Sequence, residues 1–138
     1  MEVNLRILIV DGQGGGVGRS LVEAISKKCT SVEIVAVGTN SVATTNMLRG
    51  TGINAATGEN AVIYNSRHTD VIIGPIGIVM ANAMFGEITP KMAEAISSSE
   101  ASVILIPMNR CHATVVGVEE KKLSDYIDEV VERILQMM

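Results

Sequence analysis

The sequence predicts a three-layer α/β fold, in which a mostly parallel sheet carries helices on both faces. Two observations predict it. Short apolar runs alternate with helical patterns along the 138 residues. A cluster of five glycines within residues 12–18 stands between the first apolar run and the first helical pattern. No linker, repeat or low-complexity stretch divides the chain, so we expect residues 1–138 to form a single Rossmann-like domain.

The first half of the chain shows two strand–helix units. An apolar run predicts a strand at 5–10, and apolar residues at helical spacing predict a helix at 17–28. A second strand is expected at 32–37. A helix at 41–49 follows it, because Asn40 or Ser41 can serve as its N-cap and Gly50 lies beyond its end.

The second half repeats the pattern. Residues 71–73 predict a strand, after which Pro75 can occupy the first position of a helix at 76–85 that Gly86 closes. Thr89 and Pro90 open a helix at 90–98 by the same cap-then-proline logic. An apolar run predicts a strand at 103–106, and a clear amphipathic pattern predicts a helix at 122–137.

Two segments allow more than one interpretation. Residues 61–65 have strand-like composition, but the alternation of elements favours a helix within 57–67 and a short strand near 53–55. Residues 114–118 follow the strand at 103–106 too closely for a parallel crossover. We therefore expect them to form an antiparallel strand at one edge of the sheet.

Composition excludes several classes of function. The net charge of −4 argues against binding to a nucleic-acid backbone, and three aromatic residues give little means of stacking on bases. No apolar run is long enough for a membrane span. The two cysteines have no metal or redox spacing, and no secretory segment precedes the first strand, so the expected location is cytoplasmic. The acidic C-terminal helix is expected to present a solvated outer face.

The glycine cluster predicts a binding site for phosphate. Glycine lets backbone N–H groups approach an anion closely, and a helix N-terminus adds free N–H groups and the positive end of the helix dipole. One or two glycines would be enough for a tight turn, so five exceed the structural need. Loops at the carboxyl ends of the strands should converge here. The predicted binding residues are Asp11, Gly12, Gln13, Gly14, Gly15, Gly16, Val17, Gly18, Thr39, Asn40, Gly74, Pro75, Asn109 and Arg110.

The loop resembles two known phosphate-binding patterns, each incompletely. Gly12, Gly16 and Gly18 have the G-x-x-x-G-x-G spacing of short-chain dehydrogenases. However, the Tyr-x-x-x-Lys pair of that family is missing, because Tyr64 is followed by His68 and Tyr126 by Val130.

The end of the loop also looks like a P-loop. Arg19 stands where that motif requires lysine, and Gln13 stands where its first glycine belongs. The predicted ligand is accordingly a nucleotide or dinucleotide whose identity stays open, and no metal ligand is assigned.

Beyond this loop, the whole chain resembles an uncharacterised family of small Firmicutes proteins, known as a domain of unknown function. The resemblance rests on the segments VDGQGGGVG (10–18), VGTN (37–40), ATGENA (56–61), IGPIG (73–77), GEITP (86–90) and PMNR (107–110). It implies no activity.

Three functions remain open from the sequence. The first is a module that binds a nucleotide or another phosphate-containing small molecule without catalysis of its own. The second is an enzyme for a small phosphorylated substrate, with Asp11 as base and the loop 109–112 as partner. The third is an oligomeric structural subunit, since the apolar stretch 76–85 predicts a homo-oligomer. Arg110 is the expected charge partner of the ligand, and Glu87 is expected to support the helix that begins at Pro90.

Overall fold

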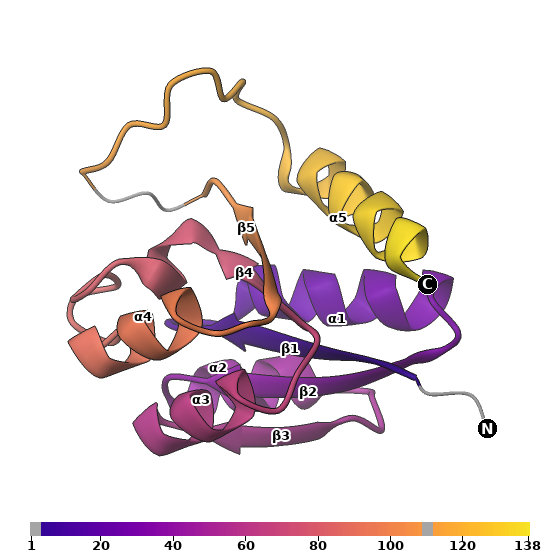
Figure 1. Cartoon of the computed structure of the whole chain (residues 1–138), viewed down its shortest axis with the longest axis horizontal. Helices are drawn as coiled ribbons and strands as arrows, with labels where there is room; N and C mark the ends of the chain where they lie inside the picture. The colour runs from indigo at the N-terminus through magenta and orange to yellow at the C-terminus, as the bar shows by residue number, and fades with distance from the viewer. Residues whose placement is uncertain (1–3, 109–111) are drawn as a thin grey trace.

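The computed structural model describes residues 4–108 and 112–138, whose centre is a sheet of parallel strands in the order β3-β2-β1-β4-β5 (Figure 1). The strands are β1 (Leu5–Asp11), β2 (Val32–Gly38), β3 (Asn54–Thr57), β4 (Val71–Pro75) and β5 (Ser102–Ile106). The predicted three-layer Rossmann-like architecture is confirmed.

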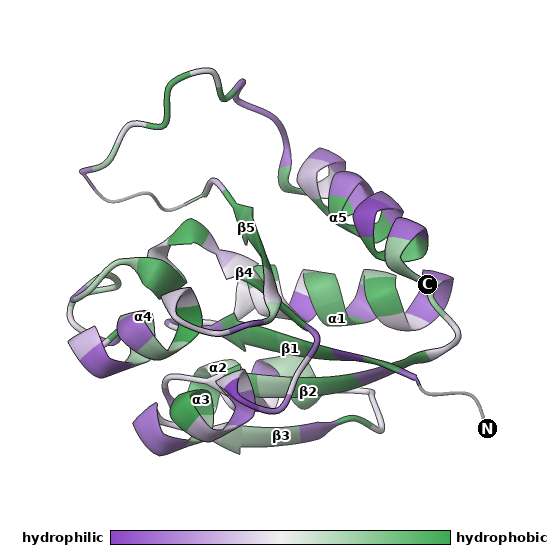
Figure 2. Cartoon of the chain, viewed as in Figure 1, coloured by the Kyte–Doolittle hydropathy of each residue, from purple (hydrophilic) through white to green (hydrophobic). Residues whose placement is uncertain are grey.

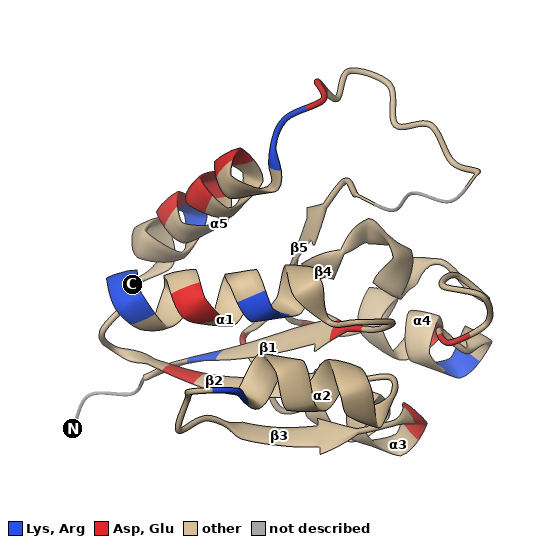
Figure 3. Ribbon diagram, turned by 180° about the vertical axis from the view of Figure 1, so that it is seen from behind, with Lys and Arg blue, Asp and Glu red and all other residues tan. Residues whose placement is uncertain are grey.

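Helices cover both faces of this sheet, as Figures 1 and 3 show from opposite sides. One face carries α1 (Gly16–Lys28), α2 (Ser41–Leu48) and α5 (Leu123–Met137). The other carries α3 (Glu59–Ser66), α4 (Pro90–Ser97) and a short 3₁₀ helix, η1 (Ile76–Val79). Among the described residues, no helix combines the length and the apolar character needed to cross a membrane.

The central strand β1 is buried on both sides. Ile7 and Ile9 pack with Leu21 of α1 in one apolar cluster, while Leu8 and Val10 belong to the cluster on the opposite face. This is the two-sided burial expected of a parallel sheet between helices. Figure 2 shows the resulting hydropathy, with apolar strands in the middle and polar residues on the outer side of α5.

Local signals placed most element boundaries correctly. The Asn40 side chain caps α2 by accepting from the Ala43 N–H at 2.9 Å. Thr89 caps α4 by accepting from the Met92 N–H at 3.1 Å, and Pro90 is the first helical residue. The short strand and the helix expected within 53–67 are confirmed as β3 and α3.

The predicted helix over 76–85 is wrong. Only η1 forms there, and Pro75 is the last residue of β4. Residues 80–87, called the 80–87 turn below, are closed by several short-range backbone bonds, two of which join them to Ile88. The Asn82 N–H donates to the Ile88 carbonyl at 2.7 Å, and the Ile88 N–H donates to the Ala83 carbonyl at 3.1 Å. These bonds join residues six and five positions apart, so they satisfy backbone groups of the segment without the i→i−4 pattern of an α-helix.

The same turn removes most of the apolar surface that suggested a homo-oligomer. Ile78, Ala83 and Met84 are buried against the sheet, whereas Phe85 is fully exposed. The stretch 76–85 is therefore largely part of the protein's own core, and Phe85 is what remains of the expected patch.

The predicted antiparallel strand at 114–118 is also wrong. Residues 112–122 form no strand, and this part of the chain arches away from the sheet (Figure 1). Val116 is 93% exposed and Gly117 has a φ of 87°. A β-branched composition makes a strand only where a neighbouring edge accepts it, and this segment does not pair with β5.

Candidate functional site

The strand order creates a topological switch point beside β1. The chain runs outward from β1 to β2 and β3 in one direction and to β4 and β5 in the other. In such sheets, ligands bind outside the carboxyl ends of the strands where the order reverses. The glycine loop, residues 12–18, leaves β1 at this point and leads directly into α1.

Asp11 holds the glycine loop in shape. Its Oδ1 accepts from the Gly12 N–H at 2.8 Å, and its Oδ2 accepts from the Gly18 N–H at 2.7 Å. The residue is only 4% exposed. Burial raises the pKa of Asp11, although these two N–H donors lower it in part and the negative charge of Glu87 raises it again. Because both oxygens are engaged inside the loop, Asp11 acts as a structural brace.

Three of the five glycines are closely packed, so that a Cβ at each would come within 3.0 Å of a neighbouring atom. A Cβ on Gly12 would lie 2.6 Å from the Met84 sulfur, and a Cβ on Gly15 would lie 2.8 Å from the Ala43 backbone. Gly15 also has a φ of 72°, which side chains disfavour. A Cβ on Gly18 would collide with Met47. These positions explain more of the glycine cluster than the sequence analysis attributed to structure.

In the described part of the chain, neither packing nor backbone conformation requires glycine at the other two positions. Gly14 and Gly16 are exposed, have no positive φ, and would meet nothing within 4 Å if they carried a Cβ. Their N–H groups donate to no acceptor within residues 4–108 and 112–138. Both lie at the N-terminus of α1, whose cap Gly15 supplies no side chain. Free N–H groups and the helix dipole therefore coincide at an open surface.

Thr39 and Asn40 lie beside this loop, as predicted. The Thr39 N–H donates to the Asp11 carbonyl at 3.0 Å, so the end of β2 is tied to the end of β1. The Asn40 Nδ2 donates to the Gln13 carbonyl at 3.0 Å, and the Asn46 Nδ2 donates to the Gly14 carbonyl at 2.9 Å. Two amide side chains of the α2 region thus support the outer part of the loop.

Glu87 is the residue whose role the sequence analysis missed. Its Oε1 accepts from the Gln13 N–H at 2.8 Å, the Thr39 hydroxyl at 2.6 Å and the Asn40 Nδ2 at 2.7 Å. Burial alone would raise the pKa of Glu87, but these three hydrogen bonds outweigh it and hold the pKa below its usual value. The carboxylate therefore faces the glycine loop, and the expected role of supporting α4 is not what its contacts show. The only sequence signal that Glu87 belongs to the site was the segment GEITP (86–90), one of the segments that carry the family resemblance.

Gly74 and Pro75 are brought to the same sheet edge but lie in its buried layer. Both are buried residues of β4. A Cβ on Gly74 would collide with the Val10 carbonyl, so close strand packing accounts for this glycine. The predicted residues Asn109 and Arg110 lie outside the described residues. Arg19 is engaged elsewhere, since it donates to the Asn46 carbonyl at 3.0 Å and pairs with Glu23 at 2.9 Å.

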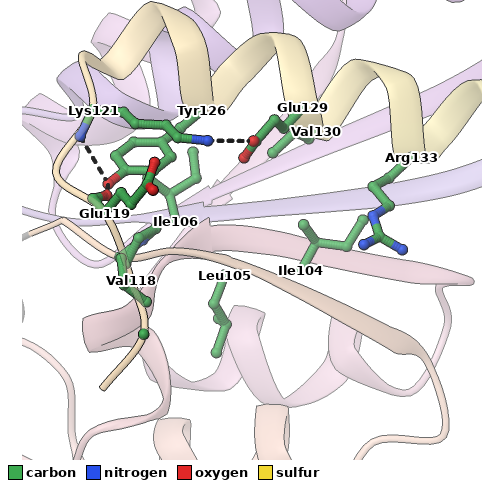
Figure 4. A pocket seen from close by; sticks show the side chains of 12 residues that line it. Ile104, Leu105, Ile106, Val118, Glu119, Lys121, Tyr126, Glu129, Val130 and Arg133 are labelled. Carbon is green, nitrogen blue, oxygen red and sulfur yellow. Dashed lines mark hydrogen bonds and ion pairs between the residues drawn. The ribbon is translucent and has the colours of Figure 1, made fainter. Parts of the chain in front are cut away.

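A separate hollow of about 370 Å³ lies between β5 and α5 (Figure 4). Some of its polar side chains are hydrogen-bonded or paired within the hollow. The Tyr126 hydroxyl donates to the Glu119 carbonyl at 2.6 Å, and Lys121 pairs with Glu129 at 2.7 Å. The hollow shares no lining residue with the glycine loop.

The acidic residues of α5 lie on the outer, exposed side of that helix (Figure 3), as the sequence predicted.

The described residues hold no group of three or more histidine, cysteine, aspartate or glutamate side chains placed to bind a metal ion. The site is therefore built from backbone N–H groups, hydroxyl and amide donors, and two carboxylates.

The resemblance to a domain of unknown function is confirmed by a family model that matches nearly the whole chain. Residues 6–138 match the family model described as Domain of unknown function (DUF3842). No curated protein matches the sequence. Among solved structures, the chain is similar to a dodecameric FMN-dependent UbiX-like decarboxylase from Escherichia coli O157:H7, at 17% identity and a TM-score of 0.42. That similarity covers 96% of this chain and 93% of the other.

Proposed function

The chain belongs to the DUF3842 family, and we propose that this member binds a nucleotide or another phosphate-bearing small molecule at the N-terminus of α1. The observation that carries the proposal is the pair Gly14 and Gly16. Neither glycine is needed for packing or for backbone conformation, and both leave an N–H group open at the switch point of the sheet. A phosphate oxygen is the acceptor that suits such a place.

The proposal assigns no catalysis to Asp11. A general base must lie within hydrogen-bond reach of the proton that it takes from the substrate. Both Asp11 oxygens accept backbone N–H groups, and the residue is almost completely buried. The alternative function, an enzyme that uses Asp11 as its base, therefore has no support from this residue. We assign the site to binding.

Calorimetry with AMP, NAD⁺ and inorganic pyrophosphate tests this function, in a buffer free of phosphate. We expect at least one of them to bind the wild-type protein. Gly16→Val places a branched side chain over the open N–H groups and should weaken that binding by about 10–150-fold, which corresponds to losing about 1.5–3 kcal/mol of charge-assisted hydrogen bonding. The fold should persist, because a Cβ at Gly16 meets nothing.

Gly52→Val is the matched control. Gly52 is also exposed, has no positive φ and has open space around its Cβ, but it precedes β3 at the opposite edge of the sheet. This variant should bind like the wild type. Equal affinity of Gly16→Val and Gly52→Val, or no binding of any probe to any variant including Glu87→Ala, would rule out the proposed site.

We further propose that the protein forms a homo-oligomer through Phe85. Its side chain, in the 80–87 turn, is fully exposed, so an isolated chain would leave this aromatic ring in water. Light scattering at about tens of micromolar should show more than one copy for the wild type and a shift toward monomer for Phe85→Ser. A monomeric wild type would contradict this proposal without affecting the ligand site.

A further inference from the structure

One carboxylate oxygen collects three donors at the candidate site. The Glu87 Oε1 accepts from a backbone N–H, a hydroxyl and a side-chain amide, all between 2.6 and 2.8 Å. The donors belong to Gln13, Thr39 and Asn40, three residues predicted to bind the ligand. Glu87 itself is distant in sequence, 74 residues beyond Gln13.

This is the environment that an oxyanion of a ligand would need. Carboxylate and phosphate oxygens accept from the same N–H, hydroxyl and amide donors, and both carry negative charge. Within the described residues, no cation pairs with Glu87. The site therefore already holds an anionic oxygen supplied by the chain.

Gly14, whose N–H group is open, directly follows Gln13, whose N–H group donates to Glu87, and the open N–H of Gly16 comes two residues later. Along the loop, an open oxyanion position therefore follows one that Glu87 fills. Two adjacent positions suit a diphosphate group better than a single phosphate.

Glu87 can leave its position without disturbing the core. Its side chain is half-buried, whereas the flanking Met84 and Ile88 are buried and anchor the turn. A rotation about its side-chain bonds would release the three donors while the backbone stays in place. The turn itself holds non-glycine residues at positive φ, namely 58° at Met84 and 56° at Phe85. Its conformation therefore depends on the packing around it.

We propose that Glu87 is an internal competitor, whose carboxylate fills one of two adjacent oxyanion positions and is displaced by a ligand carrying a diphosphate group. This rests on the proposed function, because the open position is the phosphate site at Gly14 and Gly16. It deepens that function in two ways. It names the class of ligand, and it states that the protein's own side chain opposes binding.

The test compares inorganic pyrophosphate with inorganic phosphate by calorimetry on the full chain. Glu87→Ala vacates the second position and removes a repelling charge, so its affinity for pyrophosphate should exceed that of the wild type by at least about tenfold. Phosphate, which can use the open position alone, should gain less. Glu87→Gln keeps an acceptor oxygen without the charge, so its affinity for pyrophosphate should lie between those of the wild type and Glu87→Ala.

Glu120→Ala is the control for net charge, since Glu120 is exposed and lies on the connection to α5. It should bind like the wild type. Glu87→Ala should also melt at a lower temperature than the wild type when no ligand is present, because three donors lose their acceptor. Lower stability combined with tighter binding is the signature of a displaced internal ligand.

The outcomes separate the two proposals. If the wild type binds pyrophosphate and Glu87→Ala binds it equally or more weakly, Glu87 is a supporting residue and the inference is overturned, while the proposed function stands. If neither the wild type nor either Glu87 variant binds any probe, the proposed function fails. If Glu87→Ala does not fold, Glu87→Gln decides by the same comparison.

Discussion

Two segments at the same edge of the sheet reach unusual backbone conformations by different means. The glycine loop, residues 12–18, has Gly15 at a φ of 72°, where a side chain would also meet the Ala43 backbone, and one non-glycine residue, Gln13, at 49°. The 80–87 turn has Gly86 at 90° but also three non-glycine residues at positive φ, namely Asn82, Met84 and Phe85. The conformation at Gly15 is encoded locally by residue type. The conformation of the turn is imposed by the burial of Ala83, Met84 and Ile88 against the sheet.

The two segments also carry the two carboxylates of the site, and these differ in the same way. Asp11 is buried within its own loop, and its pKa is raised by burial. Glu87 reaches across from the other segment, and its hydrogen bonds hold its pKa below the usual value. The Asp11 carboxylate holds the loop together through the N–H groups of Gly12 and Gly18, and the Glu87 carboxylate accepts from the N–H of Gln13. The following predictions test this distinction.

The largest effect is expected from Asp11→Ala. It leaves the N–H groups of Gly12 and Gly18 without an acceptor in a buried place, at a cost of about 3–5 kcal/mol for two hydrogen bonds to a charged group. Urea denaturation measures the loss. Asp11→Asn keeps one acceptor oxygen and should lose less. A loss below about 1 kcal/mol for Asp11→Ala would show that Asp11 is not the brace of the loop.

Gly15→Ala should be the next most destabilising change. It places a side chain at a φ of 72° and against the Ala43 backbone. Left-handed conformation costs about 1–2 kcal/mol and overpacking about 1–3 kcal/mol, so we expect a total of about 2–5 kcal/mol in the same urea experiment. Gly14→Ala is the matched change, because its Cβ meets nothing, and it should stay within about 0.5 kcal/mol of the wild type. Similar losses in both variants would contradict the division of the glycines into packed and open ones.

Phe85→Gly should stabilise the isolated monomer slightly, in denaturation at a protein concentration below that at which the proposed oligomer forms. Relief of a left-handed residue contributes about 1–2 kcal/mol, and the extra freedom of glycine in the unfolded chain offsets about 0.5–1 kcal/mol of it. The expected net gain is about 0.5–1 kcal/mol, read from the shift in the denaturation midpoint. Val42→Gly, an exposed apolar residue within α2, should instead lose about 0.5–1 kcal/mol. If Phe85→Gly loses stability to the same extent, the turn is not strained at this position.

The smallest effects are the opposite pH dependences of the two carboxylates. Because the pKa of Asp11 is raised above its ordinary 3.8, the native state binds more protons, and its contribution to stability falls as pH rises from that value through the folded pKa. Because the pKa of Glu87 is lowered, its contribution is present above its ordinary 4.5 and is lost as pH falls through the folded pKa. The stability difference between the wild type and Asp11→Asn should therefore fall with rising pH, and that between the wild type and Glu87→Gln should rise. Slopes of equal sign in denaturation series between pH 3 and 7 would show that the two carboxylates do not differ in this way.

Local sequence signals sufficed for most of the fold. The alternation of apolar runs and helical patterns determined the parallel α/β class, Asn40 and Thr89 determined two helix starts, and the glycine cluster determined where the candidate site lies. Each of these depends on residues within one turn or one strand of each other. For the same reason, Thr39 and Asn40 could be assigned to the site from their position at the end of β2.

Only the tertiary structure decided the features that depend on distant partners. The apolar segment 76–85 was predicted to be a helix, but much of it forms a turn packed on the sheet. The segment 114–118 has β-branched residues, but it pairs with no strand of the sheet. Which glycines are needed for packing depends on Met84, Ala43 and Met47, which lie far along the chain. The contact between Glu87 and Gln13 spans 74 residues. Composition and periodicity report the preferences of a segment, whereas its partner is selected only when the whole chain has folded.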